Sequence, residues 1–174
     1  MHRVRVYVDG FNLYYGMHTA FGRQYLWLDL DALATSLLRE GQQLDAVSYF
    51  TARVRNDLVS EQRQDVYLQA LCARSTRLAV VESRFQQKTW RCPACGVART
   101  TYEEKETDVS IAVALVEDAA CGAYDTALVI SGDSDLCPAV RAAKRLQPGR
   151  KSSRSFRRNG SPIHCGPSLT ACFD

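Results

Sequence analysis

Short apolar segments alternate along this chain with longer segments in which apolar residues recur every three or four positions. The short segments are rich in valine, leucine and tyrosine, and they predict β-strands at residues 3–8, 44–52, 77–85 and 126–131. The longer segments predict helices at residues 28–40, 60–75, 106–120 and 135–146. Because strands that alternate with helices form mostly parallel sheets with helices on both faces, we expect an α/β fold of three layers, α/β/α.

Two segments interrupt this alternation. Residues 86–103 are polar and contain the sequence Cys-Pro-Ala-Cys-Gly, and we interpret them as an insertion or β-ribbon. Residues 147–174 show no periodicity and hold three of the five prolines of the chain. We therefore expect one domain at 1–146, with the insertion at about 86–103, followed by an irregular basic tail.

The composition fits a single globular domain. Hydrophobic residues make up 46% and charged residues 24% of the 174 residues, which argues against extensive disorder. The net charge of +3 is too small to indicate a nucleic-acid partner by itself. Apolar segments of membrane-spanning length are missing, and a strand is predicted from residue 3, which leaves no room for a signal peptide. We expect a cytoplasmic protein without a membrane partner.

Carboxylates stand at the ends of predicted elements. Asp9 ends the first strand, Asp133 and Asp135 follow the fourth, and Asp108 lies at the start of the apolar helix 106–120. Each position alone also fits an ordinary turn or helix cap. The carboxyl ends of parallel strands lie along one edge of a sheet, where α/β proteins bind their ligands. Together, the four carboxylates predict a site for Mg²⁺ or Mn²⁺, which prefer oxygen ligands.

Three blocks of the sequence carry a resemblance to a known family. YVDGFNLYYG (7–16), EEKETDVSIAVALVEDA (103–119) and DTALVISGDSDLCPAVRAAKRL (125–146) resemble the motifs of the NYN domain, in the LabA-like branch of the PIN-like nuclease superfamily. The resemblance extends over residues 1–146 with the blocks in the expected order. It implies a parallel, PIN-like α/β sheet with an acidic pocket that binds a divalent metal and acts on RNA.

The resemblance also implies roles for individual residues. The acidic pocket and its metal ligands would be Asp9, Asp108, Asp133 and Asp135, and Asn12 would bind a phosphate or a water ligand of the metal. Lys105 would approach the phosphate or orient an acid, or it is an ordinary solvated lysine. The expected activity is metal-assisted hydrolysis of RNA phosphodiester bonds.

Two alternative functions stay open. A catalytically silent RNA-binding or regulatory module could retain the same acidic pocket. A haloacid-dehalogenase-like phosphatase also uses Mg²⁺ and strand-end aspartates, but that family typically carries a second aspartate two positions after the first. Phe11 occupies that position here, which disfavours the phosphatase.

Basic and aromatic residues flank the predicted insertion. Basic side chains interleaved with aromatic ones suit single-stranded RNA, through phosphate contacts and base stacking. A solvated β-ribbon would show the same composition, so both interpretations stay open. The candidate RNA-binding residues are Arg84, Lys88, Arg91 and Arg99, together with Lys105.

Cys92 and Cys95 have the spacing of a zinc knuckle. A structural zinc ion normally has four protein ligands, and the sequence contains no second pair of this kind. A bound zinc ion, a zinc ion bridging two copies in a homodimer, and a free dithiol turn all remain open.

The tail at 147–174 allows two interpretations. Five basic residues within 150–158 could form an arm that contacts RNA. The abrupt loss of periodicity could also mean that this end of the chain is read in a shifted frame, in which case the sheet lacks an edge strand.

Overall fold

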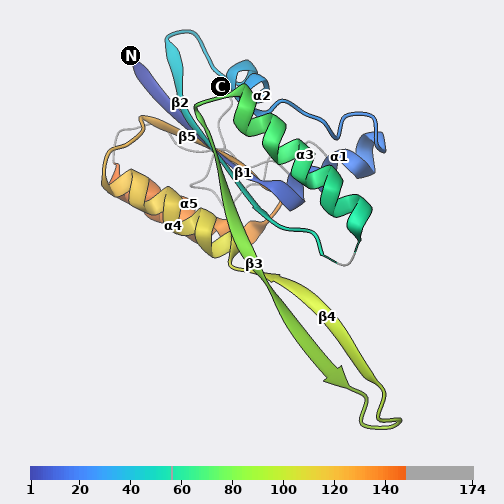
Figure 1. Ribbon diagram of the computed structural model, residues 1–174. Coiled ribbons are helices and arrows are strands. Elements are labelled where there is room, and N and C mark those ends of the chain that lie inside the picture. Colours follow the sequence, from blue (N-terminus) through green and yellow to red (C-terminus); the bar gives the residue numbers. More distant parts are fainter. Residues whose placement is uncertain (56, 148–174) are drawn as a thin grey trace.

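The computed structural model describes residues 1–55 and 57–147, except for the side chains of 84–88 and 99–105. Its described strands form one sheet in the order β4-β3-β2-β1-β5 (Figure 1). All neighbours are parallel except β3 and β4, which are antiparallel. The strands are β1 (His2–Asp9), β2 (Gln42–Ala52), β3 (Leu78–Arg91), β4 (Ala98–Lys105) and β5 (Thr126–Ile130).

Helices cover both faces of this sheet (Figure 1). One face carries α1 (Gly10–Phe21), α2 (Leu30–Ser36) and α3 (Leu58–Arg74). The other carries α4 (Thr107–Ala120) and α5 (Cys137–Leu146), which follows the short 3₁₀ turn η1 (Ser134–Leu136). The prediction of a three-layer α/β fold with a mostly parallel sheet is therefore confirmed. None of the helices in the described part of the chain is both long and apolar enough to cross a bilayer.

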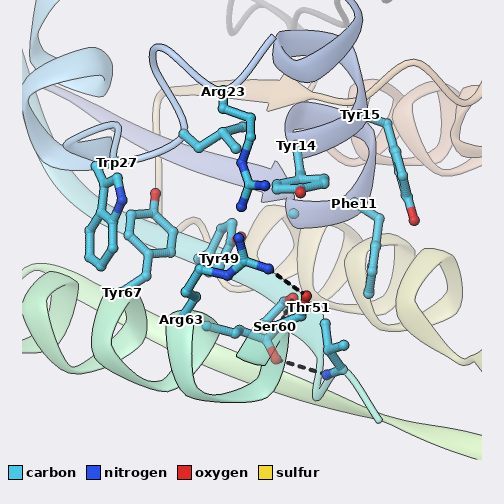
Figure 2. Close-up of a pocket in the computed structure, with 14 residues that line it drawn as sticks. Phe11, Tyr14, Tyr15, Arg23, Trp27, Tyr49, Thr51, Ser60, Arg63 and Tyr67 are labelled. Atoms are coloured by element: carbon cyan, nitrogen blue, oxygen red, sulfur yellow. Dashed lines mark hydrogen bonds between the residues drawn. The ribbon is translucent and has the colours of Figure 1, made fainter. Parts of the chain in front are cut away.

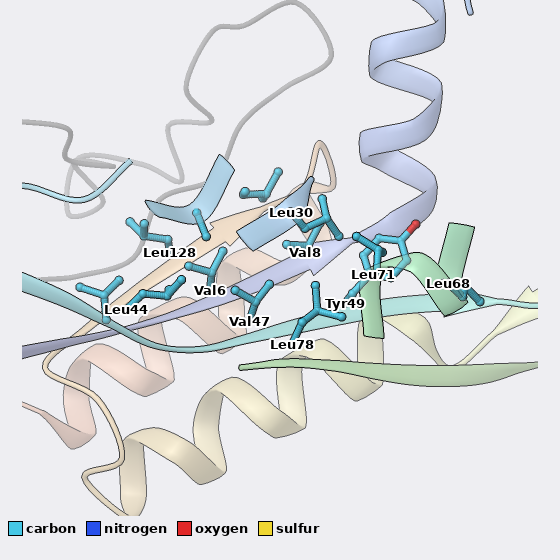
Figure 3. Close-up of a cluster of buried hydrophobic side chains, with 13 residues drawn as sticks. Val6, Val8, Leu30, Leu44, Val47, Tyr49, Leu68, Leu71, Leu78 and Leu128 are labelled. Carbon is cyan, nitrogen blue, oxygen red and sulfur yellow. The ribbon is translucent and has the colours of Figure 1, made fainter. Parts of the chain in front are cut away.

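The central strand β1 separates two apolar layers. Val4, Val6 and Val8 are buried in one cluster together with leucines of α2 and α3 (Figure 3). Tyr7 points to the opposite face and packs with residues of α4 and α5, among them Leu115. Because alternate side chains of a strand face opposite sides, a strand buried on both sides must be apolar at nearly every position.

A polar contact within the second layer ties α4 to the sheet. The hydroxyl of the fully buried Tyr7 donates to a carboxylate oxygen of Asp118 at 2.6 Å. Arg5 donates to the other oxygen at 2.8 Å and to Asp45 at 2.7 Å. Burial, and then the bond to Asp118, raise the pKa of Tyr7 well above its usual range. Tyr7 is therefore a neutral donor that satisfies a carboxylate at the edge of the core.

The structure differs from the sequence prediction in three elements. Helix α1 was not predicted, although it begins directly after Asp9. The helix expected at 28–40 is shorter and spans Leu30–Ser36; it begins at Leu30 because the Asp29 side chain caps its first turn. The strand expected at 77–85 continues to Arg91 and forms a long ribbon with β4 that extends away from the body (Figure 1).

Gly10 makes the junction between β1 and α1 possible. A β-carbon at this position would lie 2.7 Å from the backbone oxygen of Phe50 and 2.8 Å from the hydroxyl oxygen of Tyr49. The backbone oxygen belongs to the buried strand β2 and has little freedom to move.

Replacing Gly10 with alanine should therefore lower the free energy of unfolding by about 1–3 kcal/mol, the usual cost of overpacking. Urea unfolding followed by circular dichroism measures this change. An unchanged unfolding midpoint would show that α1 can move away from β2 at little cost.

Candidate acidic site and adjoining aromatic cleft

Asp9 is a buried carboxylate with defined hydrogen-bond donors. It is the last residue of β1, only 2% exposed, and its side chain caps α1. One oxygen accepts the backbone N–H of Asn12 at 3.0 Å. The other accepts the Asn12 side-chain amide and, at 2.8 Å, the hydroxyl of Ser131. These donors offset the loss of water around the carboxylate and hold it in one orientation.

The segment after β5 continues this network. The hydroxyl oxygen of Ser131 accepts the backbone N–H of Asp133 at 3.0 Å. The Asp133 side chain accepts the N–H of Asp135 at 2.8 Å and caps η1. Asp133 is thus the cap of this turn, whereas the sequence alone allowed either Asp133 or Asp135 to cap it. Asp133 is half-buried, and Asp135 is exposed.

Asp108 completes a group of four carboxylates. It lies in the first turn of α4, after Glu106, whose backbone is left-handed with φ 82° and whose side chain makes no capping bond. Partial loss of water around the carboxyl group raises the pKa of Asp108, although the residue as a whole is exposed, and the charges of Asp133, Asp9 and Asp135 raise it further. Three separate segments therefore bring their carboxylates into one electrostatic neighbourhood at the carboxyl edge of the sheet.

The donor chemistry of this neighbourhood fits a divalent cation in part. Carboxylate oxygens are the ligands that Mg²⁺ and Mn²⁺ prefer, and a cation would relieve the mutual repulsion of the four aspartates. However, within residues 1–55 and 57–147 no three His, Cys, Asp or Glu side chains are arranged to hold one metal ion together. The residues fit the ion by charge and atom type, but they do not form a ligand cluster.

The candidate RNA-binding residues lie on the β3–β4 ribbon. Arg91 is exposed at the end of β3. The side chains of Arg84, Lys88, Arg99 and Lys105 lie outside the described part of the structure. In the backbone ladder, Arg84 pairs with Lys105, and Trp90 pairs with Arg99. The ribbon therefore brings Arg84 and Lys105, which are far apart in sequence, to facing positions on two neighbouring strands.

Cys92 and Cys95 occupy the turn of the ribbon, and both are free thiols. The N–H of Gly96 donates to the Cys92 carbonyl at 2.9 Å, which closes the turn. Hydrogen bonds from the backbone N–H groups of Cys95 and Ala94 lower the pKa of the Cys92 thiol. No further cysteine or histidine of the described residues joins this pair in a metal cluster.

An aromatic cleft, which was not predicted from the sequence, adjoins the acidic site. It encloses about 290 Å³ between α1, the loop after it, β2 and α3 (Figure 2). Two arginines, Arg23 and Arg63, line it, and the described lining includes no carboxylate. Its aromatic lining residues are Phe11, Tyr14, Tyr15, Trp27, Tyr49 and Tyr67. Half of these residues belong to α1, the helix that the periodicity did not reveal.

Gly10 and Tyr49 connect the cleft to the acidic site. Gly10 lines the cleft and directly follows Asp9 in the chain. Burial raises the pKa of Tyr49 to about 12; a hydrogen bond with Thr51 opposes this shift, and the charge of Asp9 adds to it. A ligand in the cleft would therefore lie near Asp9.

Comparison with known proteins assigns the family. The family model described as "NYN domain" matches residues 3–149. The chain belongs to the NYN domain family. NYN domains form part of the PIN-like superfamily, and the family consists generally of nucleases that bind RNA and use divalent metals. This membership gives the haloacid-dehalogenase-like phosphatase no support.

Two individual proteins are similar to this NYN domain. The crystal structure of a protein of unknown function, VPA0982 from Vibrio parahaemolyticus RIMD 2210633, superposes with a TM-score of 0.59. That match is 19% identical and covers 92% of this chain and 85% of the other, so it shows a shared fold.

The second is 6-hydroxy-3-succinoylpyridine 3-monooxygenase HspA from Pseudomonas putida (strain DSM 28022 / S16). The alignment is 173 residues long and 28% identical. The match covers 80% of this chain and 54% of the relative. The NYN domain therefore spans about half the length of that curated relative.

Replacing Asp108 with asparagine should stabilise the metal-free protein at neutral pH. The folded-state pKa of Asp108 lies above its unfolded value, so the folded protein binds more protons between the two values. Stability due to this residue falls as pH rises through that window, and the full penalty remains at pH 7. The gain should be under about 1 kcal/mol because the side chain is exposed and water screens the repulsion.

Thermal unfolding in EDTA at pH 7 and pH 3 measures this effect. The variant should unfold at a higher temperature than the wild type at pH 7 and at nearly the same temperature at pH 3. Asp45→Asn is the control, because it removes an exposed carboxylate that is paired with Arg5. A lower unfolding temperature for Asp108→Asn at pH 7 would contradict the repulsion.

Proposed function

We propose that this NYN domain is a metal-dependent ribonuclease that hydrolyses phosphodiester bonds of single-stranded RNA in the cytoplasm. The observation that carries the proposal is the electrostatic coupling of Asp108 to Asp9, Asp133 and Asp135. Mutually repelling carboxylates at a ligand-binding edge lower stability unless a cation joins them. The proposed catalytic unit is residues 1–146, with the ribbon as an insertion at about 86–103.

The residues of the acidic site would have two roles, metal binding and orientation of the metal ligands. Asp9, Asp108, Asp133 and Asp135 would hold Mg²⁺ or Mn²⁺. A bound ion of this kind supplies charge neutralisation at the phosphate and activation of water. Asn12 acts on Asp9, because both its backbone N–H and its side-chain amide donate to that carboxylate. It therefore fixes the orientation of the most buried acid in the site.

The ribbon would contact the RNA outside the site of cleavage. Arg84, Lys88, Arg91, Arg99 and Lys105 would pair with backbone phosphates, a contact that positions a strand without reading its sequence. A zinc ion at Cys92 and Cys95 would need two further ligands. A second copy of the chain in a homodimer is one source of them.

A second candidate function is the binding of a small heteroaromatic acid. The name of the P. putida relative indicates a hydroxypyridine that carries an acid group. The aromatic cleft, with its two arginines, has the chemistry to hold such a ring. The relative is about twice as long as the matched region, so the activity in its name requires a separate test on this chain.

Purified protein should cleave labelled single-stranded RNA in the presence of Mg²⁺ or Mn²⁺ and should be inactive in EDTA. Asp9→Asn and Asp133→Asn should each reduce the rate roughly 100-fold or more, the effect of losing several kcal/mol of charge stabilisation. Asp45→Asn should cleave like the wild type, because Asp45 lies near the start of β2, at the opposite end of the strands. Gel electrophoresis of the products measures the rates.

Three outcomes separate the candidates. Binding of RNA without cleavage by the wild type would favour the silent RNA-binding module. Cleavage that persists in both aspartate variants would place the activity elsewhere. Saturable binding of 6-hydroxynicotinate, in a protein that neither binds nor cleaves RNA, would favour the heteroaromatic acid.

Metal binding has a readout that does not depend on activity. Mn²⁺ should raise the unfolding temperature of the metal-free wild type, because an ion that binds only the folded state stabilises it by about 2.7 kcal/mol at 100 times its Kd. Differential scanning calorimetry measures the shift. The shift should shrink in Asp9→Asn and remain in Asp45→Asn, and equal shifts in all three proteins would contradict a site at Asp9.

A further inference from the structure

The aromatic cleft has a rigid floor. The Tyr67 hydroxyl donates to the Leu28 carbonyl at 2.8 Å, which joins α3 to the loop after α1. The Tyr49 ring meets the Tyr67 ring edge to face, with centroids 6.3 Å apart, and Tyr49 is 7% exposed. Gln64 donates to the Ala52 carbonyl at 2.9 Å and accepts the Val54 N–H at 2.8 Å. These contacts join α3 to β2 and to the loop after α1 before any ligand enters.

Large aromatic surfaces remain exposed above this floor. Trp27 is 59% exposed although it packs edge to face on Tyr67, with ring centroids 5.9 Å apart. Tyr14 on the opposite wall is 42% exposed. An apolar surface that is gathered in a cleft and left open to solvent usually marks a binding site. The exposed rings favour a flat ligand that stacks on them.

The charge of the cleft specifies the ligand further. Figure 2 shows the guanidinium groups of Arg23 and Arg63 pointing into the cavity from different walls. Arg63 donates to the Val59 carbonyl at 3.2 Å and to the Ser60 hydroxyl at 2.9 Å, both on its own helix. Neither arginine forms an ion pair with a carboxylate of the described residues. Other arginines of this part of the chain do, among them Arg3, Arg5, Arg53, Arg74 and Arg77.

An aromatic wall and two available guanidinium groups together match an anion with a flat ring. Guanidinium groups bind phosphate through paired hydrogen bonds. The volume of about 290 Å³ lies at the small end of the range for ligand pockets, roughly 300–1,000 Å³. It suits one nucleotide rather than a longer ligand.

We propose that the aromatic cleft binds one nucleotide of the RNA strand, its base stacked on Trp27 and its phosphate paired with Arg63 and Arg23. The cleft adjoins Asp9 through Gly10 and Tyr49, so this nucleotide flanks the phosphate at the acidic site. The inference rests on the proposed function in that RNA is the substrate. It adds a subsite that holds the RNA strand on the face of the sheet opposite α4 and α5.

The two tryptophans of the chain, Trp27 and Trp90, provide the test. Both are 59% exposed, so neither Trp→Phe substitution opens the core. In W90F, Trp27 is the single fluorophore; in W27F, Trp90 is. We expect AMP or UMP, added in EDTA, to quench W90F saturably and to leave W27F nearly unchanged. Ribose 5-phosphate, which lacks the base, should give little quenching.

Arginine variants of W90F test the phosphate contact. Arg63→Gln should weaken AMP binding about 10-fold or more, the worth of a charged hydrogen bond. Arg141→Gln is the matched control, because Arg141 is also exposed but lies on α5, on the other face of the sheet. Circular dichroism confirms that each variant is folded. Equal affinities in the two arginine variants would overturn the assignment of the phosphate.

Other results decide the proposal as a whole. Equal quenching of W27F and W90F, or no saturable quenching of W90F, would overturn the subsite. Tighter binding of 6-hydroxynicotinate than of AMP would assign the cleft to a small acid instead. RNA cleavage that depends on Asp9, with no quenching of W90F, would remove the subsite and keep the nuclease. Quenching of W90F by AMP with no cleavage would keep the subsite and remove the nuclease.

Discussion

Burial of the Asp9 carboxylate governs the geometry at the carboxyl edge of the sheet in this NYN domain. A carboxylate that is almost removed from water must receive hydrogen bonds, and the donors come from Asn12 on α1 and Ser131 after β5. The same contacts therefore start a helix, join the ends of two neighbouring strands and orient an acid. The hydrogen bonds that stabilise the fold around Asp9 are thus the same ones that orient its carboxylate.

The position of α1 follows from this cap and determines the aromatic cleft. Because α1 begins immediately after Asp9, Gly10 must pass close to the backbone of Phe50 and the ring of Tyr49. The next turns of the helix then place Phe11, Tyr14 and Tyr15 along one wall of the cleft. A different start for α1 would move that wall away from Tyr49 and Tyr67, and the cavity would open.

The carboxyl edge of the sheet thus carries two environments of opposite character. Partial desolvation and the charges of Asp133, Asp9 and Asp135 disfavour the ionised form of Asp108 in the metal-free fold, as its raised pKa indicates. The adjoining cleft is aromatic and positively charged, with no described acid in its lining. Contacts such as those of Tyr7 and Arg5 with Asp118, on the α4 side of the sheet, stabilise the scaffold that holds both.

The alternation of strands and helices, the layered architecture and the acids at the strand ends could all be predicted from the sequence. These features are local, because apolar periodicity reflects which faces of an element are buried, and a parallel sheet then aligns its carboxyl ends. The family resemblance rested on the same segments. Helix α1 was missed because its segment GFNLYYGMHTAF contains two glycines and aromatic residues on several sides, and so shows no single apolar stripe.

The depth at which each acid is buried and the position of the cleft follow from how separate elements pack together. Asp9 is buried and Asp108 is exposed, although both stand at the end of an apolar element in the sequence. Asp133 and Asp135 could each have capped the next turn. The backbone N–H of Asp133 donates to the Ser131 hydroxyl, and the Asp133 side chain then accepts the N–H of Asp135 and caps the turn. The cleft is assembled from α1, a loop, β2 and α3, between residues 10 and 67. Its residues share no spacing along the chain, because packing of separate elements, not periodicity within one, brings them together.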